Sequence, residues 1–216
     1  MDTSRIFNKS FNDLSILQNS TNENTTMKPQ FIFVFDFDLT LTLKNASDIY
    51  MNSNYIELFE SEKKLFKLKE LFKKINDLGS VIYINTRALA SDINHILTSV
   101  GINQLIKEVM GSKNIENINK PFSYFELDKY KLLEIKNIDI LWAIKKVTFL
   151  NQIKENEQVD NNNILFFDDI PLNINTAKLN GYNNSFLIGS SDSGLYGLDY
   201  LLVKLEQIIE VCFSYI

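Results

Sequence analysis

Cysteine and histidine are almost missing from this chain of 216 residues, because each occurs only once, as Cys212 and His95. A single cysteine cannot form an intrachain disulfide, which favours a reducing compartment. One cysteine and one histidine are also too few for the zinc sites that proteins usually build from these residues. We interpret Cys212 as a packing residue and His95 as a satisfied or exposed side chain, with neither in the functional site.

The sequence also lacks long hydrophobic runs and an excess of positive charge. No stretch approaches the roughly 20 apolar residues that a membrane-spanning helix requires, and the first thirty residues lack the apolar core of a signal peptide. These absences predict a cytoplasmic protein that does not enter a membrane. The formal net charge of −5 gives no electrostatic reason to expect nucleic-acid binding. The oligomeric state is left open.

Only three prolines and seven glycines interrupt the chain, which begins with a polar stretch and continues in alternating apolar patterns. We expect residues 1–30 to form a flexible N-terminal extension and residues 31–216 to form one domain. Apolar, β-rich runs predict strands over 31–37, 81–85, 105–110, 163–169 and 185–189. Helical periodicity predicts helices over 61–79, 91–101, 140–156, 171–181 and 198–212, the second of them with Ser91 as its N-cap. This alternation predicts an α/β fold, with a parallel sheet covered by helices on both faces.

Polar residues follow three of the predicted strands. The three pairs are Asp36 and Asp38, Thr86 and Arg87, and Asp168 and Asp169. In open parallel sheets, ligands bind at the carboxyl ends of the strands. One polar pair at a strand end is unremarkable, but three such pairs that meet at one edge predict a functional site.

Four carboxylates in a small volume cannot all stay ionised without a compensating cation, and clustered oxygen ligands suit Mg²⁺. A lysine is available from the predicted helix 140–156. Lys146 shares a helical face with the apolar residues 149, 150 and 153, whereas Lys145 points about 100° away from that face. We therefore prefer Lys146 as the site lysine and keep Lys145 as the alternative. Carboxylates, a divalent metal, a hydroxyl and a lysine together indicate phosphoryl transfer.

These residues resemble the four ordered motifs of the haloacid dehalogenase (HAD) superfamily. The match consists of Asp36-Phe37-Asp38-Leu39-Thr40, Thr86 after an apolar strand, a lysine on a helix, and Asp168-Asp169 after another strand. It covers roughly residues 31–190. The resemblance implies a three-layer Rossmann-like fold with a five-stranded parallel sheet in the order 5-4-1-2-3.

The resemblance also implies a role for each motif residue. Asp36 is the expected nucleophile, which forms an aspartyl-phosphate, and Asp38 is the expected general acid and base. The expected phosphate-binding residues are Thr86, Arg87 and Lys146. The expected Mg²⁺ ligands are Asp36, Asp38, Asp168 and Asp169, with Asp38 acting through its backbone carbonyl as is usual in the family. An acid at the position of Asp38 favours phosphate esters as substrates.

We expect residues 111–139 to form a small insert or lid, and no segment is long enough for the full cap domain that members of this superfamily often carry. The resemblance implies that such an open site serves phosphorylated substrates, including macromolecular ones. The predicted function is a Mg²⁺-dependent phosphatase. The alternatives are a polynucleotide end phosphatase and a non-catalytic HAD-like binding module.

Several neighbouring residues have more ordinary interpretations. Arg87 is as suited to pairing with a local carboxylate as to binding phosphate. Asn173 has either a supporting role behind the site or a place on a helix surface. Thr40 and Thr42 are expected to satisfy backbone groups in the turn after the first strand.

Overall fold

The computed structural model describes residues 30–46, 54–123, 126–127, 132, 134–189 and 197–213. The predicted N-terminal extension, apart from Gln30, lies outside the described residues, as does part of the predicted insert. Among the helices of the described part, none is both long enough and apolar enough to cross a membrane.

Five parallel strands form the sheet: β1 (Ile32–Phe35), β2 (Val81–Leu89), β3 (Glu108–Ser112), β4 (Ile164–Asp168) and β5 (Ser185–Leu187). Their order across the sheet is β3-β2-β1-β4-β5. Read from the other edge, this is the order 5-4-1-2-3, so the predicted topology is confirmed. The strand order places β1 in the centre, between β2 and β4.

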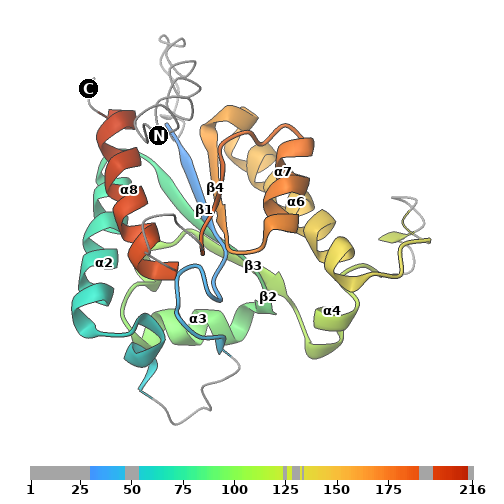
Figure 1. Ribbon diagram of the computed structural model, residues 1–216, viewed down its shortest axis with the longest axis horizontal. Helices are drawn as coiled ribbons and strands as arrows, with labels where there is room; N and C mark the ends of the chain where they lie inside the picture. Colours follow the sequence, from blue (N-terminus) through green and yellow to red (C-terminus); the bar gives the residue numbers. More distant parts are fainter. Residues whose placement is uncertain are drawn as a thin grey trace, which may run out of the picture.

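Helices cover both faces of this sheet (Figure 1). The long helices are α2 (Glu62–Asp77), α3 (Ala90–Ser99), α6 (Ile138–Glu157), α7 (Pro171–Leu179) and α8 (Gly197–Phe213). The shorter elements are α4 (Ile115–Asn119) and the 3₁₀ turns η3 (Tyr55–Phe59), η4 (Asn103–Leu105) and η5 (Asn161–Asn163). Apolar residues of α2, α3 and α8 pack in one core cluster, and those of α6 and α7 pack in another. The result is the expected three-layer α/β arrangement.

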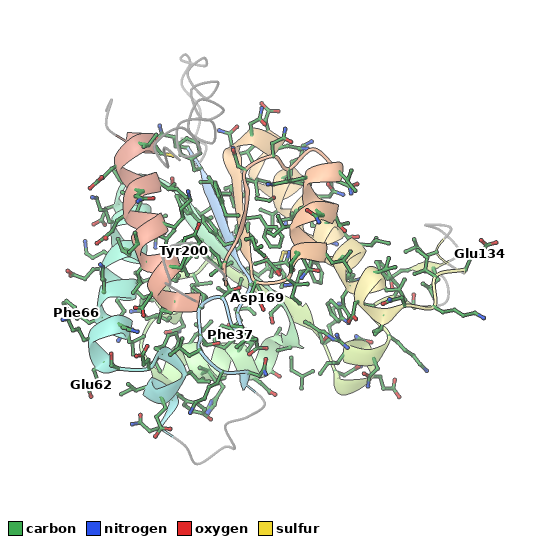
Figure 2. All side chains as sticks on the ribbon, in the orientation of Figure 1. Phe37, Glu62, Phe66, Glu134, Asp169 and Tyr200 are labelled. Atoms are coloured by element: carbon green, nitrogen blue, oxygen red, sulfur yellow. The ribbon has the colours of Figure 1, made fainter. Side chains whose placement is uncertain are left out.

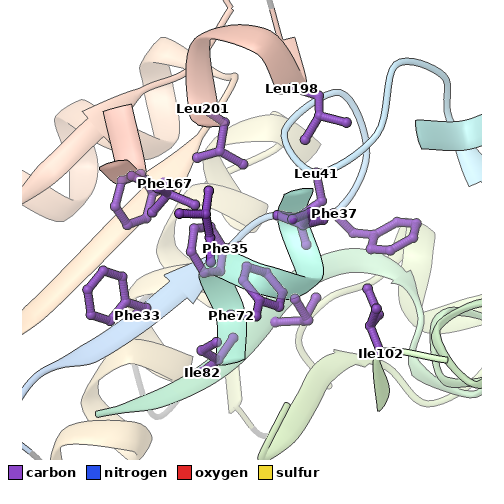
Figure 3. Close-up of a cluster of buried hydrophobic side chains, with 14 of the residues drawn as sticks. Phe33, Phe35, Phe37, Leu41, Phe72, Ile82, Ile102, Phe167, Leu198 and Leu201 are labelled. Carbon is purple, nitrogen blue, oxygen red and sulfur yellow. The ribbon is translucent and has the colours of Figure 1, made fainter. Parts of the chain in front are cut away.

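Successive residues of β1 enter these two clusters in turn, as the alternation of a strand requires. Phe33 and Phe35 pack on the side of α2 and α8 (Figure 3), whereas Ile32 and Val34 pack on the side of α6 and α7. The Phe35 ring lies 4.8 Å from that of Phe167 on β4, measured between centroids. The same alternation directs the next residue, Asp36, toward α6.

The strand boundaries differ from the predictions, most of all at the end of β2 and the start of β3. β2 continues to Leu89 instead of ending at Asn85, because β3 pairs with it again beyond an irregularity in the register. β3 begins at Glu108 rather than 105, because the preceding residues Asn103–Leu105 form a 3₁₀ turn. Thr86 and Arg87 therefore belong to the end of β2 rather than to the loop after it.

Most helix starts differ by one or two residues, and the starts of α6 and α3 show why. The α6 helix begins at Ile138 because the side chain of Asn137 accepts a hydrogen bond from the amide of Asp139 at 2.8 Å, which satisfies a first-turn donor. The expectation that Ser91 caps α3 is wrong. Leu89 precedes this helix without a side-chain cap, and the Ser91 hydroxyl hydrogen-bonds to Asp92 instead.

Candidate active site

Three aspartates gather where the central strands end. Each of Asp36, Asp168 and Asp169 offers a carboxylate oxygen, and these oxygens lie within 4.8 Å of one another. Asp36 directly follows β1, Asp168 is the last residue of β4, and Asp169 comes next in the chain. The labelled Asp169 lies near the middle of the molecule, close to Phe37 in this view (Figure 2). Asp36 and Asp168 are buried, whereas Asp169 is half-buried.

Lys146 joins this cluster from α6. Its Nζ lies 2.6 Å from Oδ1 of Asp36 and 2.6 Å from Oδ2 of Asp168. Lys145 instead forms an ion pair with Glu126, with 3.2 Å between Nζ and Oε1, and its Nζ lies 4.7 Å from the Phe122 ring centroid. The structure therefore places Lys146, and not Lys145, at the carboxylates, as the helical phase predicted.

Asn173 on α7 hydrogen-bonds to the Asp168 carboxylate through its side-chain amide. Its Nδ2 lies 2.9 Å from Oδ1 and 3.0 Å from Oδ2 of Asp168. The amide of Ile170 donates a further hydrogen bond to Oδ1 at 2.8 Å. Asn173 is buried, so the structure favours the supporting role over the helix-surface alternative. Together these contacts fix the orientation of the Asp168 carboxylate.

The electrostatics of the cluster favour a bound cation. Burial raises the pKa of the Asp36 carboxyl well above its ordinary value; Lys146 opposes this effect and Asp168 reinforces it. Burial and the Asp168 charge likewise raise the pKa of Asp169. Burial alone would lower the pKa of Lys146, but the charges of Asp168 and Asp36 raise it. One ammonium group faces three carboxylates, so a divalent cation would relieve the remaining repulsion.

The donor set fits Mg²⁺ better than a transition metal. All three side chains offer carboxylate oxygens, which are hard ligands, and no histidine or cysteine belongs to the group. Asn173 and the Ile170 amide orient one of the three carboxylates through hydrogen bonds, as is common around metal ligands. Asp36, Asp168 and Asp169 are therefore the residues of this group that can hold a metal ion.

The carboxylate of Asp38 lies apart from this group of three. Its Oδ1 accepts a hydrogen bond from the amide of Ala46 at 2.6 Å, which ties it to the loop after β1. The next residue, Leu39, has a φ of 60°, a backbone conformation that non-glycine residues rarely adopt. The structure thus brings three of the four expected carboxylates together, and the metal contact of the Asp38 backbone stays a prediction.

The two threonines of this loop differ. The Thr42 hydroxyl lies 2.8 Å from the carbonyl of Lys44 and 3.1 Å from that of Phe37, which confirms its expected role in the turn. The same expectation is wrong for Thr40, whose buried Oγ1 has no hydrogen-bond partner within the described residues.

Thr86 and Arg87 lie where β2 departs from regular pairing with β3. The irregularity falls between Asn85 and Leu89. Thr86 is buried, and its Oγ1 accepts a hydrogen bond from the amide of Ala88 at 3.1 Å. Gly111 on β3 makes room for this segment, because a Cβ there would lie 2.8 Å from the Ala88 carbonyl oxygen and 3.1 Å from Cγ2 of Thr86.

Arg87 is engaged outside the carboxylate cluster. Its Nη1 lies 3.3 Å from Oδ1 of Asp139 on α6, and its guanidinium carbon lies 5.9 Å from the Trp142 ring centroid. The structure shows the local carboxylate partner that the sequence left open as an alternative. A phosphate contact by Arg87 stays a prediction, as does one by Thr86.

The sequence interpretation passed over Asn85, which belongs to the site region. This residue is buried, and its Nδ2 donates a hydrogen bond to the backbone carbonyl of Lys146 at 3.0 Å. The available signal was an amide side chain at the end of the apolar run Val81–Ile84, next to Thr86. It was overlooked because an asparagine at a strand end has many ordinary explanations.

No protein-family model matches the sequence, and no curated protein matches it either. Among solved structures, it is similar to a haloacid dehalogenase-like hydrolase from Bacillus subtilis, with 15% identity, a TM-score of 0.47, and coverage of 86% of this chain and 91% of that one. A predicted phosphatase from Clostridium acetobutylicum matches with 13% identity, a TM-score of 0.45, and coverage of 82% and 98%. A haloacid dehalogenase-like family hydrolase from Streptococcus pneumoniae matches with 13% identity, a TM-score of 0.41, and coverage of 82% and 90%.

Proposed function

We propose that this protein is a Mg²⁺-dependent phosphatase of the HAD type, which hydrolyses phosphate monoesters through an aspartyl-phosphate on Asp36. The observation that carries the proposal is the position of Lys146, whose Nζ lies 2.6 Å from both Asp36 and Asp168 in a buried cluster. A cation held between two carboxylates at strand ends, beside a third, suits phosphoryl transfer, because a fixed positive charge stabilises the charge on the transferred group.

In the first half-reaction, a carboxylate oxygen of Asp36 attacks the phosphorus atom of the substrate. The bond from phosphorus to the ester oxygen breaks, and Asp38 donates a proton to that leaving oxygen. The product alcohol departs, and the phosphoryl group stays on Asp36 as an acyl phosphate. The hydrogen bond from the Ala46 amide to Asp38 supports this role, because it restrains a carboxyl group that stands two residues after the nucleophile.

In the second half-reaction, Asp38 removes a proton from a water molecule, and the water oxygen attacks the phosphorus atom of the acyl phosphate. The bond between phosphorus and the Asp36 oxygen breaks, which releases inorganic phosphate and regenerates the carboxylate. Lys146 stabilises the charge on Asp36 and on the phosphoryl oxygens. The Thr86 hydroxyl donates a hydrogen bond to one of those oxygens. Asp38 thus returns to its protonated state after one turnover.

Asp36, Asp168 and Asp169 would hold Mg²⁺, which when bound neutralises carboxylate and phosphoryl charge. Asn173 keeps Asp168 oriented for that role through its two contacts. The proposed substrates are phosphate monoesters, macromolecular or small. A cytoplasmic location is part of the proposal, because a single cysteine fits a reducing compartment.

The test is hydrolysis of an aryl phosphate by the wild-type protein and by Asp36→Asn, each with Mg²⁺ and with a chelator. We expect turnover that requires Mg²⁺ and that the substitution lowers by at least about a thousandfold, because the nucleophile is lost. A folded wild-type protein that binds Mg²⁺ but turns over neither aryl phosphates nor 5′- or 3′-phosphorylated oligonucleotides would contradict the proposal. Turnover confined to the oligonucleotides would favour the polynucleotide end phosphatase.

The role of Asp38 has its own measurement. Asp38→Asn removes the proton donor, and the loss should be larger for alkyl phosphates than for aryl phosphates, because an alkoxide leaving group depends more on protonation. Equal losses for both classes of leaving group would assign Asp38 a purely structural role.

A further inference from the structure

We infer that Asn85 is a positioning residue that sets the place of the Lys146 ammonium group, an inference that rests on the proposed function. The sheet register places Asn85 in the same row as the active-site aspartates. Phe35 on β1 pairs with Ile84 on β2 and with Phe167 on β4. One residue further along each strand stand Asn85, Asp36 and Asp168. These three residues therefore lie side by side across the central strands.

The row faces α6. On β2, Tyr83 packs in the core cluster of α6 and α7, and its neighbours Ile82 and Ile84 pack in the other, so Asn85 follows the alternation back toward α6. Its Nδ2 lies 3.0 Å from the carbonyl oxygen of Lys146. This row of residues contacts Lys146 at two places. Asn85 hydrogen-bonds to the backbone carbonyl of Lys146, and the two aspartates bind its ammonium group.

The side-chain oxygen of Asn85 indicates that this position is not optimised for apolar packing. Only the NH₂ group can donate to a carbonyl, so the contact with Lys146 fixes the orientation of the side chain. Oδ1 is left buried and without a hydrogen-bond partner within the described residues. A buried, unpaired acceptor lowers stability, whereas an apolar residue would fill the space without that cost. Local conflicts of this kind are expected at functional sites.

The opposite end of the same helix provides a matched control. Glu157 is the last residue of α6, and its carboxylate accepts a hydrogen bond from the Tyr83 hydroxyl. Tyr83 and Asn85 therefore both tie α6 to β2 through a buried hydrogen bond, and they stand two positions apart on the strand. Only the Asn85 tie is made at the residue that contacts Asp36 and Asp168.

The first measurement compares the steady-state kinetics of Asn85→Leu and Tyr83→Phe. Asn85→Leu nearly preserves side-chain volume and removes the donor, so the Lys146 backbone is free to shift relative to the aspartates. We expect kcat to fall by about tenfold to a hundredfold, with KM changed less than about threefold, because small misplacements of a catalytic group act mainly on the transition state. Tyr83→Phe should keep kcat within about twofold of wild type, even where it lowers the midpoint of thermal unfolding.

The second measurement does not depend on turnover. An amine-reactive ester is applied to the folded proteins, and acylation of each lysine is followed by mass spectrometry. Lys146 is buried and paired with two carboxylates, so it should be protected in the wild-type protein and in Tyr83→Phe. We expect its acylation to be several times faster in Asn85→Leu. If that variant does not fold, Asn85→Ala removes the same donor.

The outcomes separate this inference from the proposed function. Wild-type turnover together with unchanged kcat and unchanged Lys146 protection in Asn85→Leu would overturn the positioning role and leave the phosphatase proposal intact. Equal effects of Tyr83→Phe and Asn85→Leu would also overturn it, because they would indicate general loosening of α6. If the wild-type protein has no phosphatase activity, the proposed function fails, and the acylation rates alone decide whether Asn85 places Lys146.

Discussion

Lys146 shows how a single side chain determines the character of this site. It is buried and contacts two carboxylates at 2.6 Å. A buried ion pair contributes little net stability when it is intact, but removal of one partner leaves uncompensated charge. The adjacent Lys145 has the same chemistry but pairs with Glu126 instead. The two lysines have different surroundings because adjacent residues of a helix point about 100° apart.

This pair gives a matched comparison of two substitutions. Lys146→Met should lower turnover by at least about a hundredfold, because it removes charge that stabilises the transition state. It should also lower the free energy of unfolding of the metal-free protein by about 3 to 5 kcal/mol. Lys145→Met should keep turnover within about twofold and reduce stability by less than about 1 kcal/mol, as is typical of partly exposed ion pairs. Aryl-phosphate kinetics and urea unfolding check both; similar effects of the two variants would refute the assignment.

At the scale of residues, the sequence predicted the core of the site and missed its supports. Asp36, Asp168 and Lys146 could be identified because strand ends and helical phase are visible in the order of apolar residues. The tie from Asp38 to Ala46 could not, because it depends on the path of an irregular loop. Asn85 was missed for a related reason: its partner is a backbone carbonyl on an element far along the chain.

The bulged end of β2 is the element that places Thr86. Gly111 on the neighbouring strand leaves space that a side chain would fill, since a Cβ there would meet the Ala88 carbonyl oxygen at 2.8 Å. Contacts this short force one of the two segments to move. Because Cγ2 of Thr86 would also lie 3.1 Å from the added atom, the displacement would reach the proposed phosphate-binding hydroxyl.

Gly111→Ala should therefore lower turnover by about tenfold or more, since a displaced positioning group acts on the transition state. Gly79→Ala is the control. Gly79 has a φ of 75° and open space around its Cβ position, so alanine there costs stability through the backbone alone. It precedes β2, at the end of the sheet remote from the site. Kinetics and thermal unfolding of both variants test the prediction, and a Gly111→Ala enzyme with wild-type turnover would contradict it.

Tyr182, between α7 and β5, links these elements to α6. Its hydroxyl donates a hydrogen bond to Oδ1 of Asn151 at 2.6 Å, and burial raises its pKa from 10.0 to about 12. Between these two values the unfolded chain has lost the proton and the folded protein keeps it, so the free energy of unfolding falls as pH rises. Tyr182→Phe should lose this part of the alkaline dependence. Denaturant unfolding between pH 9 and 12 measures it, and identical pH profiles for both proteins would contradict the linkage.

At the scale of elements, strand and helix types were predicted better than their ends. The buried strands β1, β2 and β4 stood out because both faces are apolar. The start of α6 shifted by two residues because Asn137 caps it, and β3 started later because Asn103–Leu105 form a 3₁₀ turn. Such boundaries depend on local hydrogen bonds that hydrophobic periodicity does not record.

Mg²⁺ should raise the stability of the whole molecule against unfolding. Three carboxylates and one lysine leave excess negative charge in a buried site, so the metal-free protein carries repulsion that a divalent cation removes. At a Mg²⁺ concentration about a hundredfold above Kd, the expected stabilisation is about 2.7 kcal/mol, or a rise in Tm of about 5 to 10 °C for a chain of this size.

The control for this shift is a pair of aspartate variants. A chelator should reverse the rise in Tm, and Asp168→Asn should abolish it because it removes a ligand. Asp77→Asn, which changes an exposed carboxylate at the end of α2, should leave it unchanged. A Tm that is indifferent to Mg²⁺ in the wild-type protein would count against a metal site at these residues.

The alternation of β1 has a consequence for how this chain tolerates changes in length. Its odd-numbered side chains pack toward α2 and α8, and its even-numbered ones pack toward α6. Inserting or deleting one residue within Ile32–Phe35 would exchange these two sets. The carboxylate of Asp36 would then turn into an apolar layer, away from Lys146. Exchanges between apolar residues of similar size should be tolerated in this strand, whereas a change of a single residue in its length should abolish both packing and chemistry.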